Sequence, residues 1–313
     1  MDPKHLLQEL SMRASKYSIN LDQQVFRDDS IPPSHGSSAL VYQGILRPQE
    51  IKVAIKTFRS CSPGDLEKLK LAFRELHLWS KLRHENIVPL LGITTKFDDT
   101  VSIVSEWMVN GNAHDYVQSR ANDPRPLLLG IAHGLHYLHS QPNPVLHGDL
   151  KGYNVLISAD GRALLSDFGL SHSATSSFSM SISKPLGGSV PWMSPEHIDE
   201  FEISVATDIW SFGMTALELF TGQAPYHTCR TLTNIVIQIL RGPPDRPNYE
   251  STCSRLTDDW WKLCLLCWHR DPALRPSTAD VIKRIQVSPL CAWIQLFTLN
   301  LDNCHTYFSF TAS

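Results

Sequence analysis

One β-hairpin, with polar residues at both of its ends, constrains this chain more than any other feature. Residues 155–157 (VLI) and 163–165 (ALL) are short apolar runs, and Asp160 and Gly161 lie between them. An Asp-Gly pair between two apolar runs is a strong hairpin signal, because both central residues of the tight turn need a positive φ. A hairpin returns the chain to its starting point, so the polar residues just before and just after it are expected to converge.

The residues that this hairpin would bring together suit phosphoryl transfer. Asp149 and Asn154 precede the first strand in the segment 147–154 (HGDLKGYN), and Asp167 follows the second strand. One carboxylate can accept or orient a hydroxyl proton, while a second carboxylate and an amide oxygen can bind hard cations. The alternative is that the two aspartates occupy unrelated surface turns, where most turn aspartates are found.

The rest of the chain changes from strand patterns to helix patterns near residue 109. Residues 51–58 (IKVAIKTF) alternate with period two, which predicts a strand with Ala54 and Lys56 on one face. Apolar residues recur at steps of three and four through 66–76 and again through 128–138, which predicts a helix in each segment. The first part of the chain is therefore expected to form a sheet with one helix, and the second part to be mainly helical.

Six motifs in order resemble those of the eukaryotic protein kinase catalytic domain. They are VAIK at 53–56, a helix carboxylate at Glu75, the 147–154 loop, DFG at 167–169, SPE at 194–196 and DIWSFG at 208–213, with Arg275 near the end. The resemblance implies an α+β fold of two lobes: a small lobe of five antiparallel strands and one helix, and a large, mainly helical lobe.

The resemblance also implies where the domain lies. It predicts a kinase domain over residues 24–285, with a small lobe at 24–107 and a large lobe at 108–285. Residues 1–23 then form an N-terminal lead-in. The segment 286–313 is rich in aromatic residues and contains a single charged residue, Asp302, so we expect it to lie outside the catalytic fold.

By resemblance, the chain transfers the γ-phosphoryl group of ATP, with Mg²⁺, to a Ser or Thr hydroxyl of a protein substrate. The residues assigned to catalysis are Asp149, Lys151, Lys56 and Glu75. Those assigned to ATP binding are Gly36, Val41, Ala54, Lys56, Ser105, Glu106, Met108 and Leu156. Asn154 and Asp167 are assigned to the metal.

The expected acceptor, Ser or Thr, also follows from the resemblance. Lys151 stands two residues after Asp149, as in serine/threonine kinases, and Ser189 occupies a position where such kinases place a hydroxyl that contacts the catalytic loop. The segments 84–88 (HENIV) and 191–193 (PWM) are similar to those of the tyrosine-kinase-like group. The chain therefore resembles the Ser/Thr kinases of that group that are abundant in mushroom-forming fungi.

Two departures from the family pattern keep a second function open. The glycine-rich loop reads SHGSSA at 34–39, so only its middle glycine, Gly36, is present, although glycine lets backbone amides approach phosphate closely. Gly148 replaces the arginine that in this family pairs with a phosphate on the activation segment. The alternative is therefore a pseudokinase scaffold that binds partner proteins without turnover. A small-molecule kinase of the aminoglycoside type is disfavoured by the 194–196 motif.

Composition argues against several other classes of protein. Lys and Arg number 28 and Asp and Glu 31, giving a net charge of −3, which lacks the basic footprint of a nucleic-acid binder. No apolar run approaches the roughly 18 residues of a membrane span, and the N-terminus lacks the apolar core of a signal peptide. Seven cysteines are an odd number. We therefore expect reduced thiols in a cytosolic or nuclear protein.

Two clusters could suggest metal binding, but simpler interpretations are favoured. Cys264 and Cys267 form a C-x-x-C on an apolar helix without a second pair, which predicts buried structural thiols rather than zinc ligands. His133, His136 and His139 recur along one helix with no carboxylate between them, which predicts a solvent-facing stripe.

Overall fold

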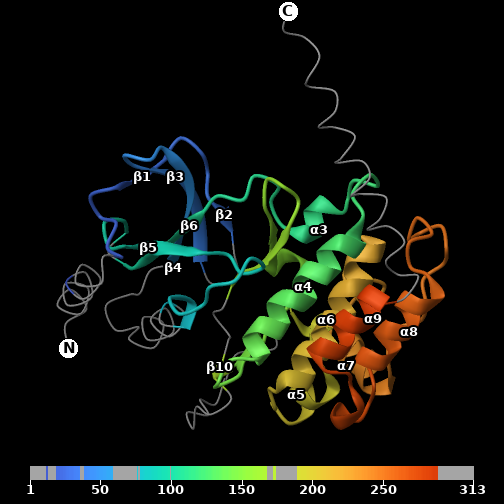
Figure 1. The fold of residues 1–313 in the computed structure, drawn as a ribbon. Helices are drawn as coiled ribbons and strands as arrows, with labels where there is room; N and C mark the ends of the chain where they lie inside the picture. Colours follow the sequence, from blue (N-terminus) through green and yellow to red (C-terminus); the bar gives the residue numbers. More distant parts are fainter. Residues whose placement is uncertain are drawn as a thin grey trace, which may run out of the picture.

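The computed structural model of the 313-residue chain describes residues 12, 19–35, 39–58, 76, 78–98, 100–167, 172–173 and 189–287. Within these residues a curled antiparallel sheet forms one lobe and helices form most of the other (Figure 1). The prediction of a two-lobed α+β fold is therefore confirmed. None of the helices in these ranges is long and apolar enough to cross a membrane.

The small lobe is built on one antiparallel sheet. Its strands are β1 (Val25–Arg27), β2 (Ser34–His35), β3 (Ala39–Leu46), β4 (Ile51–Phe58), β5 (Leu90–Thr94) and β6 (Ser102–Glu106). The order of the strands is β1-β3-β4-β6-β5. Strand β2 lies off this path and also pairs with β3. The sheet thus has six strands in the described part of the chain, where five were predicted.

The sixth strand arises because β1 and β2 both pair with β3 but are separated by residues 28–33. Pro32 and Pro33 have no N–H group and cannot donate to a ladder. Asp28 Oδ1 accepts the backbone N–H of Ser30 at 3.0 Å, which turns the chain away from the sheet.

Strand β4 has the predicted alternation. Val53 and Ile55 are fully buried and pack in the small-lobe core with Val104 of β6. Ala54 and Lys56 are half-buried on the opposite face. Because side chains alternate along a strand, the period-two pattern separates a core face from a face that is open to the site described below.

The large lobe contains seven α-helices among the described residues. They are α3 (Ala113–Tyr116), α4 (Pro124–His139), α5 (Pro195–Asp199), α6 (Val205–Thr221), α7 (Leu232–Arg241), α8 (Asp258–Cys267) and α9 (Thr278–Val287). Short elements are β7 (Val145–Leu146), β8 (Val155–Ile157), β9 (Ala163–Leu165), β10 (His172–Ser173) and the 3₁₀ turns η1 (Gly152–Asn154), η3 (Val190–Trp192) and η4 (Pro272–Leu274).

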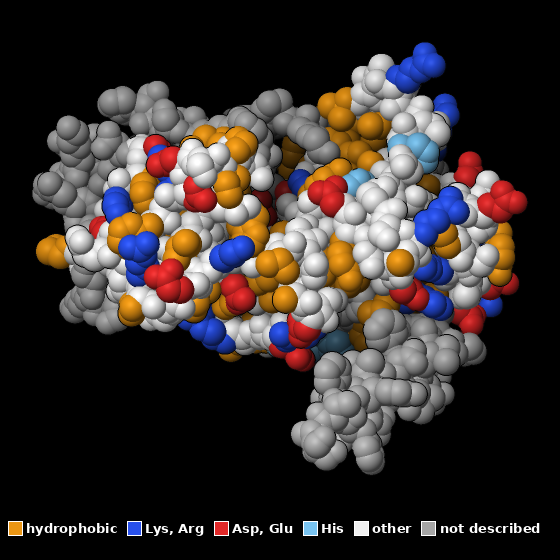
Figure 2. Space-filling view, turned by 90° about the horizontal axis from the view of Figure 1, so that it is seen from above, with side chains coloured by type: hydrophobic (Ala, Val, Ile, Leu, Met, Phe, Trp, Pro, Cys, Tyr) orange, Lys and Arg blue, Asp and Glu red, His pale blue; other side chains and the backbone are white. Residues whose placement is uncertain are grey.

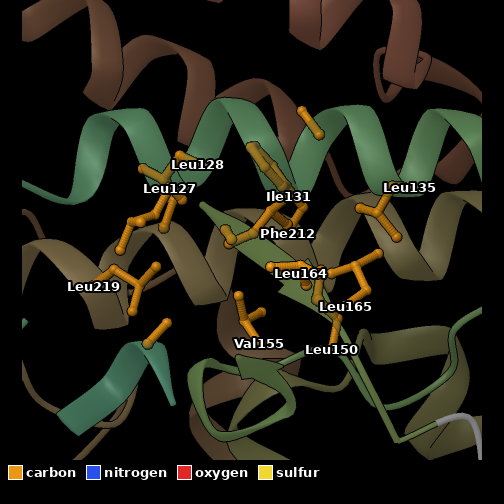
Figure 3. Close-up of a cluster of buried hydrophobic side chains, with 14 of the residues drawn as sticks. Leu127, Leu128, Ile131, Leu135, Leu150, Val155, Leu164, Leu165, Phe212 and Leu219 are labelled. Atoms are coloured by element: carbon orange, nitrogen blue, oxygen red, sulfur yellow. The ribbon is translucent and has the colours of Figure 1, made fainter. Parts of the chain in front are cut away.

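Helices α4 and α6 and the β8–β9 hairpin share one apolar core. Figure 3 shows side chains of α4, α6, β8 and β9 converging there, among them Leu127, Leu128, Ile131, Leu135, Val155, Leu164, Leu165, Phe212 and Leu219. The apolar residues of α4 recur at steps of three and four, so they form one face of the helix and are buried together. The segments on either side of the β8–β9 hairpin are therefore supported by a closely packed core.

The β8–β9 hairpin forms as predicted, with Val155 opposite Leu165 and Ile157 opposite Ala163. Its turn differs from the prediction, because only Gly161, with a φ of 82°, has a positive φ. The connection is longer than a two-residue turn: the N–H of Ser158 donates to the carbonyl of Arg162 at 3.0 Å. A five-residue connection of this kind needs only one left-handed residue.

The lobes also meet away from the connecting segment. The N–H of Val88 donates to the carbonyl of Leu165 at 3.0 Å, and the N–H of Leu165 donates to the carbonyl of Asn86 at 2.8 Å. Residues that precede β5 therefore pair with the second strand of the large-lobe hairpin.

Histidines of α4 do not all face solvent. The side chain of His139 is 5% exposed, and its Nε2 lies 2.8 Å from Asp208 Oδ2 of α6. The predicted solvent-facing stripe is wrong for His139 because α6 packs against this end of α4. Cys264 and Cys267 are buried as predicted, and burial raises the pKa of the Cys264 thiol to about 12.

Helix α9 closes the described part of the large lobe. Its N-terminus is capped by reciprocal hydrogen bonds: the N–H of Ser277 donates to Asp280 Oδ2 and the N–H of Asp280 donates to Ser277 Oγ, both at 3.2 Å. Ile285 is fully buried. The segment from residue 288 onwards lies outside the described residues.

On the face shown in Figure 2, Lys and Arg side chains are interspersed with Asp and Glu.

Candidate active site

One buried carboxylate anchors the backbone at the start of the catalytic loop, residues 147–154. Asp208, in the first turn of α6, is 1% exposed and accepts the backbone N–H groups of His147 at 2.8 Å and of Gly148 at 2.9 Å. Although burial opposes it, the hydrogen bond from His139 keeps the pKa of Asp208 below its ordinary value. A charged anchor therefore fixes the backbone just before Asp149.

Gly148 meets a backbone requirement at this point. Its φ is 75°, in the left-handed region that an L-residue adopts only with strain. Glycine therefore lets the N–H groups of two successive residues turn toward the same Asp208 carboxylate.

Asp149 and Lys151 form an ion pair at the centre of the loop. Lys151 Nζ lies 2.9 Å from Asp149 Oδ2 and donates to Ser189 Oγ at 2.6 Å. Both charged side chains are largely buried, at 11% and 14% exposed. The lysine thus joins the catalytic loop to the turn that begins η3, as the resemblance led us to expect for Ser189.

Asn154 is oriented by the same aspartate. Its Nδ2 group donates to the backbone carbonyl of Asp149 at 2.7 Å and to Asp149 Oδ2 at 2.9 Å. The carbonyl of Asn154 accepts the N–H of Ser166 at 2.9 Å, so Asn154 lies beside the residue that precedes Asp167. The hairpin therefore brings Asp149, Asn154 and Asp167 together, as predicted.

Asp167 is linked to the small lobe. Lys56 Nζ of β4 donates to Asp167 Oδ1 at 3.1 Å. Although burial opposes it, the positive charge of Lys56 and its hydrogen bond keep the pKa of Asp167 below its ordinary value, and Lys151 adds to the effect. Asp167 has a φ of 61°, a strained conformation of the kind that concentrates at functional sites.

Four predicted site residues share one face of the sheet. Val41 lies opposite Lys56 across the β3–β4 ladder, and Ala54 lies opposite Ser105 across the β4–β6 ladder. Residues directly opposite one another point to the same side of a sheet, as do residues two apart in one strand. Since Lys56 contacts Asp167, this is the face that meets the large lobe.

The other predicted ATP-binding residues that the structure describes do not belong to this face of the sheet. Glu106 ends β6 and is exposed, Met108 is buried just after it, and Leu156 is half-buried in β8. Gly36 and Glu75 lie outside the described residues.

The polar groups of the loop fit a magnesium ion. Mg²⁺ prefers oxygen ligands and usually takes only one or two from carboxylates. Both contacts of the Asn154 Nδ2 group are directed at Asp149, so its remaining polar atom, Oδ1, can serve as a hard ligand. The Asp167 carboxylate would supply the second protein ligand.

A second ion pair lies away from this site. Arg275 Nη1 and Nη2 donate to Glu196 Oε1 at 2.6 Å and Oε2 at 2.9 Å, and the two side chains are 1% and 13% exposed. Arg275 also lies over the ring of Trp210 and donates to the carbonyl of Ala206. These contacts have a structural role, because they tie α5 to the segment between η4 and α9.

Glu218 of α6 is the centre of a buried hydrogen-bond cluster that was not predicted from the sequence. This residue is 0% exposed in α6 and accepts N–H groups from Gly152, Trp192 and His114. The available signal was a carboxylate among the apolar residues of the second half of a long helix. Such a residue is almost never fully buried unless it is paired.

Comparison with known proteins agrees with this geometry. A family model described as protein tyrosine and serine/threonine kinase matches residues 34–285. The chain is 30% identical over 83% of its length to a putative leucine-rich repeat receptor-like serine/threonine-protein kinase of Arabidopsis thaliana. It is 30% identical to two more proteins of that plant, the serine/threonine-protein kinase STY17 over 80% of its length and mitogen-activated protein kinase kinase kinase 3 over 79%.

The chain spans 29%, 42% and 38% of the lengths of these three relatives. The family model covers most of the chain, from β2 to the buried Ile285 of α9. The chain therefore belongs to the protein kinase family.

Proposed function

We propose that the chain is an active serine/threonine kinase, which transfers the γ-phosphoryl group of Mg·ATP to a Ser or Thr hydroxyl of a protein. The observation that carries the proposal is the position of Lys151, whose ammonium group contacts both Asp149 and Ser189. These two contacts hold the Asp149 carboxylate, the Lys151 ammonium and the turn at Ser189 close together.

In the proposed reaction Asp149 accepts or orients the proton of the acceptor hydroxyl. The ammonium of Lys151 lies 2.9 Å from Asp149 Oδ2, where it can stabilise charge on the transferred group. Lys56, which donates to Asp167, would lie near the phosphates of bound ATP. When bound, Mg²⁺ supplies positive charge that neutralises the phosphate oxygens, and Asn154 and Asp167 would hold it there.

The Ser/Thr preference rests on the same lysine. Lys151 occupies the loop position that the resemblance associates with serine/threonine kinases, and its hydrogen bond to Ser189 gives that lysine a fixed place. The names of the relatives described above support the same acceptor class. The proposed substrate is a protein.

Phosphate transfer by the purified full chain tests this proposal. The chain is incubated with γ-labelled ATP, Mg²⁺ and dephosphorylated casein, and label is measured on casein and on the chain itself. The wild type is expected to transfer label, and Asp167→Ala to lose at least about 100-fold, because it lacks a metal ligand.

Asp160→Ala is the matched control for that variant. It makes the same substitution in the turn of the same hairpin, where Asp160 is 58% exposed and pairs with Arg162. It should retain activity within about twofold, because the effect of removing an exposed pair is small. If the wild type transfers no label, the pseudokinase scaffold replaces this proposal.

A further inference from the structure

The Glu218 cluster joins three separate elements at one buried carboxylate. Glu218 Oε2 accepts the backbone N–H of Gly152 in η1 and the indole N–H of Trp192 in η3, both at 2.8 Å. Glu218 Oε1 lies 2.7 Å from His114 Nδ1 of α3. Gly152 is three residues after Asp149, and Trp192 is three residues after Ser189, so the carboxylate supports both partners of Lys151.

Packing around this carboxylate leaves little freedom. A Cβ atom at Gly152 would lie 2.7 Å from Glu218 Oε1 and 3.1 Å from His114 Cβ. Contacts this close would force the carboxylate or the imidazole to move. Gly152 therefore lets the catalytic loop approach Glu218 without displacing the carboxylate.

His114 is the one donor in this cluster that can carry positive charge. The peptide N–H of Gly152 and the indole N–H of Trp192 are neutral donors, while Glu218 is fully buried. A buried charge is costly unless it is paired as well as hydrogen-bonded. The His114 side chain is 14% exposed, so water contributes little to this pair.

We propose that His114 is a positioning residue: as an imidazolium it balances the charge of Glu218 and so holds the catalytic loop and the η3 turn in register. The inference rests on the proposed function, since the reaction that it supports is phosphoryl transfer at Asp149.

The surroundings of His114 favour the charged form. The hydrogen bond to Glu218 raises the pKa of His114 above its ordinary value of 6.5, against the effect of burial, and the charges of Glu218 and Asp115 add to it. Asp115 belongs to α3 itself, and Glu218 faces His114 from α6. From η1, the ring of Tyr153 stacks on the imidazole with centroids 4.3 Å apart. Strand β8, which also packs on α3, has no titratable side chain.

The sign of the pH dependence follows from this raised pKa. The interaction is complete below the ordinary pKa of about 6.5 and is lost as pH rises through the raised value. The kcat/KM for a protein substrate should therefore fall on the alkaline side, because Glu218, which anchors both the loop and the turn, loses its counter-charge.

The test compares pH profiles of kcat/KM with casein as substrate. The wild type is expected to lose roughly threefold or more as pH passes the pKa of His114, since small misplacement of catalytic groups is costly. His114→Gln, which can donate a hydrogen bond but carries no charge, should lack this limb and remain low throughout. The exposed His227→Gln makes the same change elsewhere and should keep the wild-type profile. An identical alkaline limb in His114→Gln would overturn the proposal.

A measurement on the wild type alone separates this inference from the proposed function. In an NMR titration, the Gly152 amide and the Trp192 indole N–H should shift with the same pKa as the His114 ring, and that pKa should lie above 6.5. If the protein transfers no phosphate at any pH, the proposed function fails, and this titration still decides the role of His114. A His114 pKa at or below 6.5, or a Trp192 indole that does not follow it, overturns the inference.

Discussion

Lys56 and Asp167 lie 111 residues apart in the sequence, and the Lys56 ammonium donates to the Asp167 carboxylate at 3.1 Å. The contact joins β4 of the small lobe to the residue that follows the hairpin of the large lobe. Their side chains are 15% and 32% exposed, so the pair is partly open to solvent. It therefore places a cation from one lobe beside a proposed metal ligand of the other.

Replacing this lysine should reduce turnover far more than stability. Lys56→Met removes the cation that we place at the phosphates, and kcat should fall about 100-fold or more, as for other preorganised electrostatic groups. Lys52→Met is the matched control, since Lys52 is exposed on the same strand. The measurement is kcat and the KM for ATP. Equal kcat values for the two variants would contradict the role proposed for Lys56.

The Glu196–Arg275 pair should contribute to stability rather than to catalysis. Glu196→Gln leaves Arg275 buried without its counter-charge, so the free energy of unfolding should fall by roughly 3–5 kcal/mol. Urea denaturation at pH 7 measures it. The exposed Glu202→Gln should change the same quantity by less than about 0.5 kcal/mol. A change of less than about 0.5 kcal/mol in the free energy of unfolding of Glu196→Gln would show that the pair does not stabilise the fold.

The same pair predicts a pH dependence of stability. Against the effect of burial, the hydrogen bond from Arg275 lowers the pKa of Glu196 below its ordinary value of 4.5. A lowered pKa means that the stabilisation is complete above the ordinary value and is lost as pH falls through the folded-state value. The difference in unfolding free energy between wild type and Glu196→Gln should therefore shrink in acid. A difference that is constant down to pH 3 would contradict this account.

Gly148 predicts weak regulation by phosphorylation. Gly148 has no side chain that could pair with a phosphate, and its backbone N–H is already directed at Asp208. Treatment of the purified chain with phosphatase should therefore change kcat less than about threefold, since no charge-assisted contact is lost here. Loss of turnover after dephosphorylation, with recovery after rephosphorylation, would refute this expectation.

Removal of residues 288–313 should have little effect on the folded domain. The last described helix, α9, ends at Val287 and already buries Val281 and Ile285 in the large-lobe core. Truncation after Val287 should keep Tm within about 4 °C of the full chain, which corresponds to about 1–2 kcal/mol at this size. A deletion that also removes α9 is the control and should unfold the protein. A larger fall in Tm for the shorter truncation would show that the tail packs on the domain.

Local patterns in the sequence were sufficient to predict much of the fold. The alternation of residues 51–58 predicted β4, and two apolar runs around Gly161 predicted the hairpin that brings Asp149 and Asp167 together. These features depend on neighbours in the chain, so their spacing is visible in the sequence.

The contacts between distant residues could not be predicted in the same way. His114 and Glu218 are 104 residues apart, and nothing near either of them indicates the other. His139 occupies a position on α4 that looks exposed until α6 is placed against it. In both places tertiary packing, rather than the local pattern, decides which polar groups are buried and what they contact.

The central claim is that the chain phosphorylates a Ser or Thr hydroxyl of its substrate and that Asp149 acts on that hydroxyl. Identifying the labelled amino acid tests it most directly. Casein labelled by the full chain with γ-labelled ATP and Mg²⁺ is hydrolysed, and its phosphoamino acids are separated. We predict label on phosphoserine or phosphothreonine, reduced by about 100-fold or more in Asp149→Asn, as expected for loss of a catalytic base. Label on phosphotyrosine alone, or equal labelling by wild type and Asp149→Asn, would contradict the claim.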